Sequence, residues 1–406
     1  MTVFSPVAAT RVSLIIPVLL VAAASASVLS TDLYTPSLPH LTGYFQTSAE
    51  TFQLSMSLNL LGFGAAQLLY GPLSDYLGRR PVLLGGMICF AVVSLVCAFA
   101  YSIEFLIFAR TLQGVTSCAE AVVGLAIIRD LYDEEDSVRV LAAYGMAVAL
   151  APAVGPLIGG YIHIWLGWQA NFVVVSGFVV VVAALIWRFL PETLAPENRV
   201  GGRPLSLARD YMRLSAQRNF IGYALPVGFT FGALYAFITA APFVLIERMG
   251  VATQHYGLYY AALVLAYFFA SLAANRIVGR FGVELLLRAS LVIGVVSGIV
   301  TLAVVYAYEK PGALTAAISI GTFGLGFMFA TAPVRALAAS TTQRGLSAAL
   351  LGSLEMGIAA LAALTVGFFH DGTAWPLAFT FAGCNFIAAA TYIMCKPWRI
   401  PLQRID

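Results

Sequence analysis

Charged residues are scarce in this sequence. Only 10% of its 406 residues are Asp, Glu, Lys or Arg, whereas 60% are hydrophobic. An ordinary soluble domain has about a quarter of its residues charged, and no soluble core could bury so much apolar surface. The composition therefore excludes a soluble protein and indicates one for which the lipid bilayer is the main solvent.

Residues that carry metal or covalent chemistry are also few. The cysteines lie mostly inside apolar runs without the spacing of metal ligands or of a disulfide framework, and the histidines lie far apart, near the ends of apolar runs. They are Cys89, Cys97, Cys118, Cys384 and Cys395, and His40, His163, His255 and His370. No nucleotide-binding loop or catalytic triad is recognisable. We expect no cofactor and no metal, and a membrane enzyme is the least favoured function.

Long apolar runs recur along the whole chain. Because lipid offers the backbone no hydrogen-bond partner, each crossing must be a helix or a strand of a closed barrel. Barrel strands alternate over about 10 residues, whereas these runs reach the roughly 20 residues that a helix needs to cross a bilayer. The predicted spans are 13–36, 49–70, 81–101, 103–127, 137–164, 167–189, 219–246, 253–275, 284–307, 312–335, 345–369 and 374–396.

A basic linker divides the chain in two. The only long polar stretch, within 190–218, carries Arg199, Arg203, Arg209 and Arg213 among Pro, Gly and Ser, and six spans lie on each side of it. We therefore predict an all-α membrane protein of twelve transmembrane helices in two pseudo-symmetric six-helix lobes, 13–189 and 219–396. Residues 1–12 and 397–406 are the tails.

The distribution of lysine and arginine predicts the orientation, because these residues are retained on the cytoplasmic side. With the amino terminus inside, the cytoplasmic tails and loops hold 19 of the 22 Lys and Arg. Arg248 and Lys310 fall in outer loops, and Arg110 falls inside a span. Both termini and the linker are therefore expected in the cytoplasm. The same asymmetry accounts for the net charge of +3, which does not indicate nucleic-acid binding.

The two halves also share a motif. The loop from Gly71 to Pro81 reads GPLSDYLGRRP, and the exit from the eighth span, from Ala274 to Gly282, reads ANRIVGRFG. The second segment resembles a less complete repeat of the first, and it lies six predicted spans later in the chain. Such duplication is typical of secondary transporters, whose halves rock about a site near the bilayer midplane.

Four segments of the amino-terminal half carry a family likeness. They are the loop with Gly71, Asp75, Gly78, Arg79 and Arg80; an R-x-x-Q-G motif with Arg110, Gln113 and Gly114; a G-P-x-x-G-G motif with Gly155, Pro156, Gly159 and Gly160, preceded by Pro152; and a D-x-x-x-P-x-L-P motif that Asp32 begins. In these segments the sequence resembles the major facilitator superfamily, and within it the drug:proton antiporters of the bicyclomycin and chloramphenicol resistance type.

The resemblance implies a major facilitator fold, export in exchange for protons, and a latch in the first loop. In that latch Asp75 would meet the start of span 345–369, whose positive helix end favours an anion, and an arginine would meet Asp130. The alternative explanation of the arginines is retention on the cytoplasmic side, which leaves the aspartate and the glycines unexplained.

The motif of the fifth span is the one that indicates antiport rather than symport. Pro152 and Pro156 would kink the helix, while Gly155 and Gly159 would let a second helix approach. A bent, tightly packed helix pair would limit proton leak when the cavity is closed.

Asp32 and Arg110 are the first candidates for proton coupling. A charge at the centre of a bilayer costs about 2.5–3.5 kcal/mol on insertion scales, so it indicates function by default. Both residues fall in the outer parts of their spans, where they could lie at one depth and form a pair. The alternative is a static ion pair that only fixes helix packing.

Two further carboxylates lie deep in spans. Glu120 is ten residues after Arg110, so it can face the same cavity and suits a second proton or a cationic substrate; a buried glutamate bonded to a neighbouring helix is the alternative. Glu355 is a possible additional carboxylate in the other half, although its small neighbours favour a role in helix packing somewhat more.

We predict a substrate cavity with a few hydrogen-bonding groups in an otherwise apolar wall. Its expected residues are Asp32, Tyr34, Asn59, Gln113, Glu120, Tyr235 and Tyr259. The protein is then a proton-coupled antiporter that exports small amphiphilic drugs, such as amphenicol- or bicyclomycin-like antibiotics, by alternating access. Export of an endogenous metabolite or siderophore by the same mechanism is the alternative. The expected partners are substrate, protons and the lipid of a bacterial inner membrane, and a monomer is expected.

Overall fold

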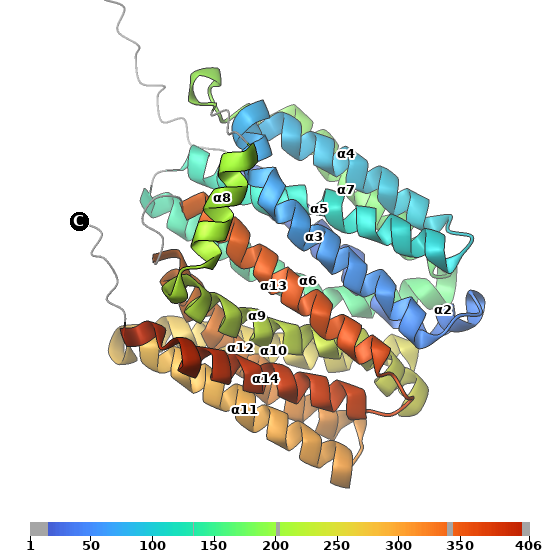
Figure 1. Cartoon of the computed structure of the whole chain (residues 1–406). Helices are drawn as coiled ribbons and strands as arrows, with labels where there is room; N and C mark the ends of the chain where they lie inside the picture. The colour runs from blue at the N-terminus through green and yellow to red at the C-terminus, as the bar shows by residue number, and fades with distance from the viewer. Residues whose placement is uncertain (1–14, 133, 200–203, 339–343, 400–406) are drawn as a thin grey trace, which may run out of the picture.

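A computed structural model describes residues 15–132, 134–199, 204–338 and 344–399. Every regular element in these residues is a helix, as predicted, and the long helices run back and forth along one bundle (Figure 1). The predicted tail 1–12 and residues 400–406 of the predicted tail 397–406 lie outside the described residues.

The long helices fall into two sets, which we call the amino lobe and the carboxyl lobe. The amino lobe contains α1 (Ile15–Asp32), η1 (Thr35–Ser37), α2 (Leu38–Tyr44), α3 (Ala49–Leu77), α4 (Arg79–Ala98), α5 (Ile103–Leu131), α6 (Glu134–Leu166) and α7 (Gln169–Phe189). The carboxyl lobe contains α9 (Arg218–Ala241), the π-helical η3 (Pro242–Arg248), η4 (Thr253–His255), α10 (Tyr256–Phe281), α11 (Val283–Ala307), α12 (Pro311–Ala338), α13 (Arg344–Phe368), α14 (Trp375–Cys395) and η5 (Pro397–Arg399). Between the lobes lie η2 (Pro196–Asn198) and α8 (Pro204–Ser215).

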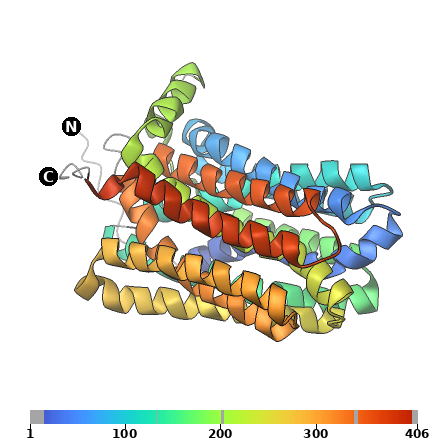
Figure 2. The same cartoon turned by 60° about the horizontal axis from the view of Figure 1, so that its bottom comes forward.

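The long helices match the twelve predicted spans to within a few residues at most ends. Within the described ranges, ten segments are long and apolar enough to cross a membrane. The other two long helices are α6, which contains the shorter apolar stretch Leu150–Leu166, and α3, which carries polar side chains such as Gln53 and Asn59. The predicted linker contains the amphipathic helix α8, which lies at one end of the bundle (Figure 2).

Helix ends have local causes. Ser48 and Ser102 cap α3 and α5 by accepting hydrogen bonds from the backbone N–H groups of Thr51 and Phe105, at 3.1 and 3.2 Å. Gly78, with φ +104°, turns the chain between α3 and α4, a backbone conformation that favours glycine. The serine caps fix where α3 and α5 begin, and the glycine fixes where α3 ends.

The segment from Gly71 to Pro81 is not the loop that the sequence suggested. α3 continues to Leu77 and α4 begins at Arg79, so Gly78 alone breaks the helix. In the second copy the turn glycine is Gly282, with φ +78°, and Gly279 lies inside α10. In both lobes the repeated motif therefore contains the turn between two long helices. The turn glycine lies nearer the end of the motif in the second copy than in the first.

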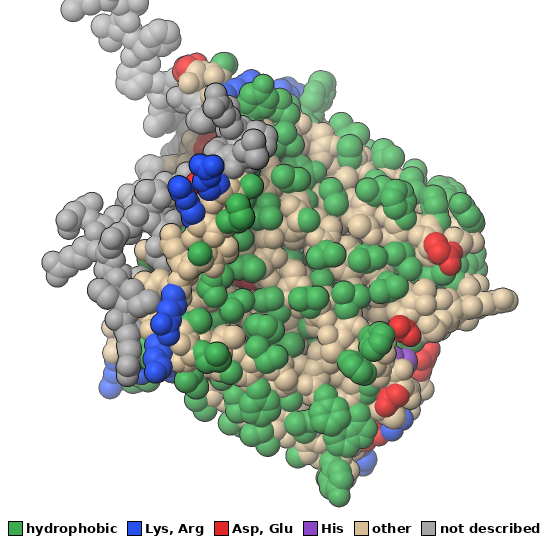
Figure 3. All heavy atoms as spheres, in the orientation of Figure 1, with side chains coloured by type: hydrophobic (Ala, Val, Ile, Leu, Met, Phe, Trp, Pro, Cys, Tyr) green, Lys and Arg blue, Asp and Glu red, His purple; other side chains and the backbone are tan. Residues whose placement is uncertain are grey.

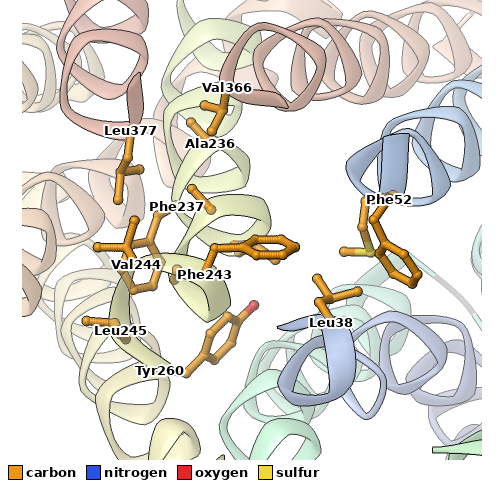
Figure 4. Packing of buried hydrophobic residues seen from close by; sticks show 14 of the residues in the cluster. Leu38, Phe52, Ala236, Phe237, Phe243, Val244, Leu245, Tyr260, Val366 and Leu377 are labelled. Carbon is orange, nitrogen blue, oxygen red and sulfur yellow. The ribbon is translucent and has the colours of Figure 1, made fainter. Parts of the chain in front are cut away.

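The largest hydrophobic core that the lobes share lies at one end of the bundle. One cluster of buried side chains joins Leu38 and Phe52 of the amino lobe to Phe237, Phe243 and Tyr260 of the carboxyl lobe (Figure 4). We call this end, where α2, η3 and η4 meet, the α2 end, and the opposite one the α8 end. The other large clusters draw their buried residues from one lobe each. The bundle is therefore closed between the lobes at the α2 end.

Candidate proton and substrate site

Asp32 lies at the last residue of α1, where the two lobes meet near the α2 end. Its side chain is 3% exposed, and its Oδ1 accepts a hydrogen bond from the Tyr260 hydroxyl of α10 at 3.2 Å. Figure 4 shows the Tyr260 ring reaching from the carboxyl lobe toward the amino lobe. Asp32 Oδ2 is buried and has no hydrogen-bond partner among the residues that the structure describes. A single carboxylate thus bonds across the lobe interface and keeps one oxygen free to take a proton.

The glycines of the fifth-span motif let α6 approach the end of α1. A Cβ atom added at Gly155 would lie 2.6 Å from the Cβ of Asp32, and one added at Gly159 would collide with the backbone of Leu33. Pro152 and Pro156 lie inside the same helix and interrupt its hydrogen-bond ladder. The close approach predicted for this motif is therefore present, and the helix that α6 contacts is the one that ends in Asp32.

Arg110 is fully buried in α5, but it does not pair with Asp32 as expected. Its Nη1 donates to the Ser30 carbonyl at 3.2 Å and to Gln113 Oε1, and its guanidinium carbon lies 5.0 Å from the centre of the Tyr34 ring. Among the described residues no ion pair joins Arg110 and Asp32. The expected pair is wrong in this conformation because α1 presents a carbonyl to the arginine while the carboxylate bonds to α10.

The two polar side chains predicted for the cavity wall are engaged inside the amino lobe. Asn59 donates to the Arg110 carbonyl at 2.7 Å, and Gln113 donates to the Ser94 hydroxyl at 2.7 Å. Gln113 is fully buried and Asn59 is 6% exposed. Both amides therefore support the segment around Arg110 in this conformation.

The predicted aromatic residues divide between the lobes. Tyr34 is fully buried and shares a hydrogen bond of 3.2 Å with Ser55 of α3. Tyr235 and Tyr259 are half-buried and pack against the shared core cluster. Tyr260, which contacts Asp32, was not selected from the sequence, although a polar ring one helical turn after Tyr256 in a predicted span was a signal that could have found it.

Glu120 is enclosed within the amino lobe. It is fully buried in α5, and in the part of the chain that the structure describes neither carboxylate oxygen has a hydrogen-bond partner. The structure does not bring it into contact with Asp32 or Arg110. An ionisable group placed so deep without a partner remains a candidate for a second proton site.

The predicted latch is partly present at the α8 end. Arg79 contacts Asp130 through Nε at 3.0 Å, as expected, and pairs with Asp75 at 2.6 Å. Asp75 thus bonds within its own motif rather than to the start of α13, next to which residues 339–343 are not described. Arg80 donates to the Trp187 carbonyl at 2.6 Å.

The sequence reasoning missed one member of this cluster. Glu192, directly after the end of α7, accepts a hydrogen bond from the Arg79 backbone N–H at 3.0 Å and lies 3.9 Å from Arg199. The carboxylate follows the last apolar span of the amino lobe, which was the only signal for it. It connects the turn at Gly78 to the first part of the linker.

Comparison with known proteins identifies the class. The family model described as the Major Facilitator Superfamily matches residues 20–363. A bacterial homolog of the human lysosomal transporter Spinster, solved in an inward-facing and occupied conformation, aligns over 96% of this chain and 97% of its own with a TM-score of 0.74 at 15% identity. The chain therefore belongs to the major facilitator superfamily, a family of transporters rather than of enzymes, and the predicted fold is confirmed.

Closer relatives narrow the class. The bicyclomycin resistance protein homolog of Haemophilus influenzae is 31% identical over 89% of this chain and 91% of its own length. The chloramphenicol resistance protein of Pseudomonas aeruginosa is 32% identical over 86% of this chain and 83% of its own. The resemblance that the four motifs indicated is confirmed by similarity over most of the chain.

Proposed function

We propose that this protein exports small amphiphilic drugs, such as amphenicol- or bicyclomycin-like antibiotics, in exchange for protons by alternating access. The names of the two relatives supply the substrate class. The observation that carries the mechanism is the carboxylate of Asp32, buried at the lobe interface with one oxygen bonded to Tyr260 and the other free.

Coupling follows from the position of that carboxylate. Tyr260 belongs to the other lobe, so opening the bundle at the α2 end separates the donor from Asp32. Losing a hydrogen-bond donor and gaining access to water both change how strongly a carboxylate holds a proton. The proton affinity of Asp32 therefore depends on which end of the bundle is open, which is the requirement for exchanging a proton against a substrate.

The charges support one orientation. On the face that Figure 3 shows, most Lys and Arg lie toward the α8 end, and most Asp and Glu lie toward the α2 end, with an apolar surface between them. Because basic residues are retained inside, we assign the α8 end and both termini to the cytoplasm of a bacterium. The α2 end, where the lobes share their buried cluster, is then the end that faces away from the cytoplasm. One chain supplies both sides of the site, so a monomer suffices.

The remaining predicted residues take supporting roles in this proposal. Arg79, Asp130 and Asp75 hold the ends of α3, α4 and α5 together at the cytoplasmic side, so that the amino lobe rocks as one unit. Arg110 holds the end of α1 through Ser30, and Glu120 offers a second protonatable group in the same lobe.

The test uses the full chain in proteoliposomes with chloramphenicol as substrate and an imposed pH gradient. We expect drug accumulation against its concentration gradient, together with counterflow of protons, and we expect Asp32→Asn to abolish the uphill step while still allowing drug exchange. Glu104→Gln, which changes an exposed carboxylate in the first turn of α5, is the matched control and should transport like the parent.

Uphill transport by Asp32→Asn at the parent rate would contradict the coupling assignment. The drug hypothesis fails if the parent protein transports none of a broad antibiotic panel and cells that express it remain as susceptible as before. Export of an endogenous metabolite or siderophore then replaces export of drugs as the proposed function.

A further inference from the structure

One side of the linker helix α8 is attached to the bundle. Leu214 is 3% exposed and packs in a buried cluster of the carboxyl lobe, and the Tyr211 hydroxyl donates a hydrogen bond to the Leu68 carbonyl of α3 at 3.1 Å. Leu207 precedes Leu214 by about two helical turns, so it lies on the same side. Through Tyr211 and Leu214, α8 therefore contacts both lobes.

The neighbouring side of α8 is exposed, and it is partly apolar and partly basic. Ala208 and Met212 lie four residues apart, so they share a helix face, and both are exposed, Met212 over 65% of its surface. Arg209 and Arg213 form the next stripe around the helix axis and are exposed as well. An apolar stripe beside a basic one is the pattern of a helix that lies in a membrane interface.

The bond between Tyr211 and α3 indicates the depth of α8. Leu68 lies 19 residues after Ala49, the first residue of α3, which is about 28 Å of helix at ~1.5 Å per residue. The hydrocarbon core of a bilayer is about 30 Å thick. Because α3 begins at the α2 end, Tyr211 meets it about one hydrocarbon thickness away, where the headgroups of the cytoplasmic leaflet begin. Tyrosine is enriched at that level.

The direction of α8 agrees with this depth. In Figures 1 and 2 it runs across the long helices rather than along them, and in Figure 2 it projects beyond them. Figure 3 shows basic side chains next to hydrophobic ones where α8 lies. A helix that crosses the spans at headgroup depth lies along the membrane surface instead of passing through the membrane.

The two arginines of the basic stripe are available for a ligand. Among the described residues Arg209 takes part in no ion pair, and Arg213 has Asp210 at 4.0 Å while its own side chain stays 72% exposed. The stripe therefore keeps a net positive charge. A guanidinium group matches the geometry of a phosphate, to which it can donate two parallel hydrogen bonds.

We propose that α8 is a membrane-surface helix that binds anionic phospholipids of the cytoplasmic leaflet, with phosphatidylglycerol as the probe. Ala208 and Met212 enter the boundary between headgroups and acyl chains, and Arg209 and Arg213 bind lipid phosphate. Each basic residue near an anionic surface strengthens membrane binding by roughly fivefold. The inference uses the orientation assigned above, but it goes beyond export because it does not depend on the exported compound.

The experiment measures amide hydrogen exchange along the purified full-length protein in nanodiscs of phosphatidylcholine, with or without added phosphatidylglycerol. We expect phosphatidylglycerol to slow exchange in α8 by at least about fivefold and to leave exchange in α11 unchanged. High salt should remove most of the difference, because it screens charges at the membrane surface.

Variants of the basic stripe have a matched control. Arg209→Gln combined with Arg213→Gln should lose the response of α8 to phosphatidylglycerol, whereas the corresponding double lysine variant should keep most of it because it keeps the charge. Arg276→Gln combined with Arg280→Gln removes two exposed arginines of α10 and should respond like the parent.

The apolar stripe has a separate test. Met212→Ser should speed up exchange in α8 severalfold in both kinds of nanodisc, because a polar side chain inserts less well among acyl chains. Met394→Ser, at a position of α14 that is 71% exposed, should leave exchange in α8 unchanged. Thermal unfolding checks that each variant is folded, and if the double glutamine variant does not fold, the salt dependence and the methionine pair decide.

The outcomes separate this site from the proposed function. Equal exchange of α8 in both kinds of nanodisc would overturn the lipid site and leave the exposed side of α8 to a protein partner. A response that survives in the double glutamine variant, or that is equally large in α11, would also contradict it. A response confined to α8 in a parent protein that exports no drug would support the lipid site and reject the exporter.

Discussion

The two lobes place their polar chemistry differently. The amino lobe contains Asp32, Arg110 and Glu120 and surrounds the arginine with a carbonyl and buried amides. In the described part of the carboxyl lobe Glu355 takes part in no ion pair, and a row of aromatic rings runs over Tyr235, Phe231, Phe329 and Tyr267. The comparison indicates that the amino lobe holds charged groups in fixed positions, whereas the carboxyl lobe offers an adaptable apolar surface. Tyr260 is the exception, since it brings a polar group of the carboxyl lobe to Asp32.

Replacing Arg110 should have the largest effect, because it tests whether the amino lobe depends on its buried charge. Arg110→Ala leaves the Ser30 carbonyl and Gln113 Oε1 without their donor, and each buried acceptor left unsatisfied costs about 1–3 kcal/mol. Thermal unfolding of the purified variant should shift to lower temperature, and pH-driven transport should be lost.

The matched change in the other lobe is Arg276→Ala, at an exposed position of α10. It should alter stability by no more than about 0.5 kcal/mol, as is usual for surface substitutions. If the two variants are equally stable, the amino lobe does not depend on its buried arginine in the way that this comparison assumes.

Replacing Tyr260 tests the bond that joins the lobes. Tyr260→Phe removes the hydroxyl that donates to Asp32 Oδ1 at 3.2 Å, and a hydrogen bond to a charged group contributes about 1.5–3 kcal/mol. We expect severalfold slower uphill transport and a pH profile displaced to higher pH, because the carboxylate loses a donor that favours its ionised form.

Tyr259→Phe is the control for that measurement. It removes a hydroxyl from the adjacent residue, which is half-buried, and it should leave the pH profile where it is. If both variants keep the parent profile, Tyr260 has a packing role only.

The smallest expected effect compares the two copies of the repeated motif. Gly78→Ala puts a side chain at φ +104° and 2.5 Å from Glu192 Oε2, which should cost about 1–2 kcal/mol. Gly279→Ala lies inside α10 with no atom near the added carbon, so it should stabilise the protein by about 0.5–1 kcal/mol. Thermal unfolding shows whether each variant is more or less stable than the parent. If both variants are less stable, the backbone of the second copy also requires glycine at this position.

The helices and the buried ionisable residues could be predicted from the sequence. Runs of apolar residues predict spans directly, because the length of a helix in lipid follows from bilayer thickness. Asp32, Arg110, Glu120 and Glu355 stand out since a charge within such a run has few structural uses, and all four are buried.

The partners of those residues could not be predicted. Asp32 and Arg110 were expected to pair because both are charged and at similar depth, yet the arginine meets Ser30 and the carboxylate meets Tyr260. Glu192 and α8 were missed because a polar linker carries no apolar run, and the amphipathic pattern of α8 acquires meaning only where Tyr211 bonds to the Leu68 carbonyl of α3 at 3.1 Å.

The sequence by itself determined that this chain lies in a membrane, which segments form its long helices, and which ionisable side chains lie within them, since each follows from local composition and the thickness of a bilayer. The tertiary structure alone decided that Asp32 bonds across the lobes to Tyr260 and that the bundle is closed at the α2 end. Side-chain partners depend on the rotation and bending of each helix, which close packing between distant segments sets.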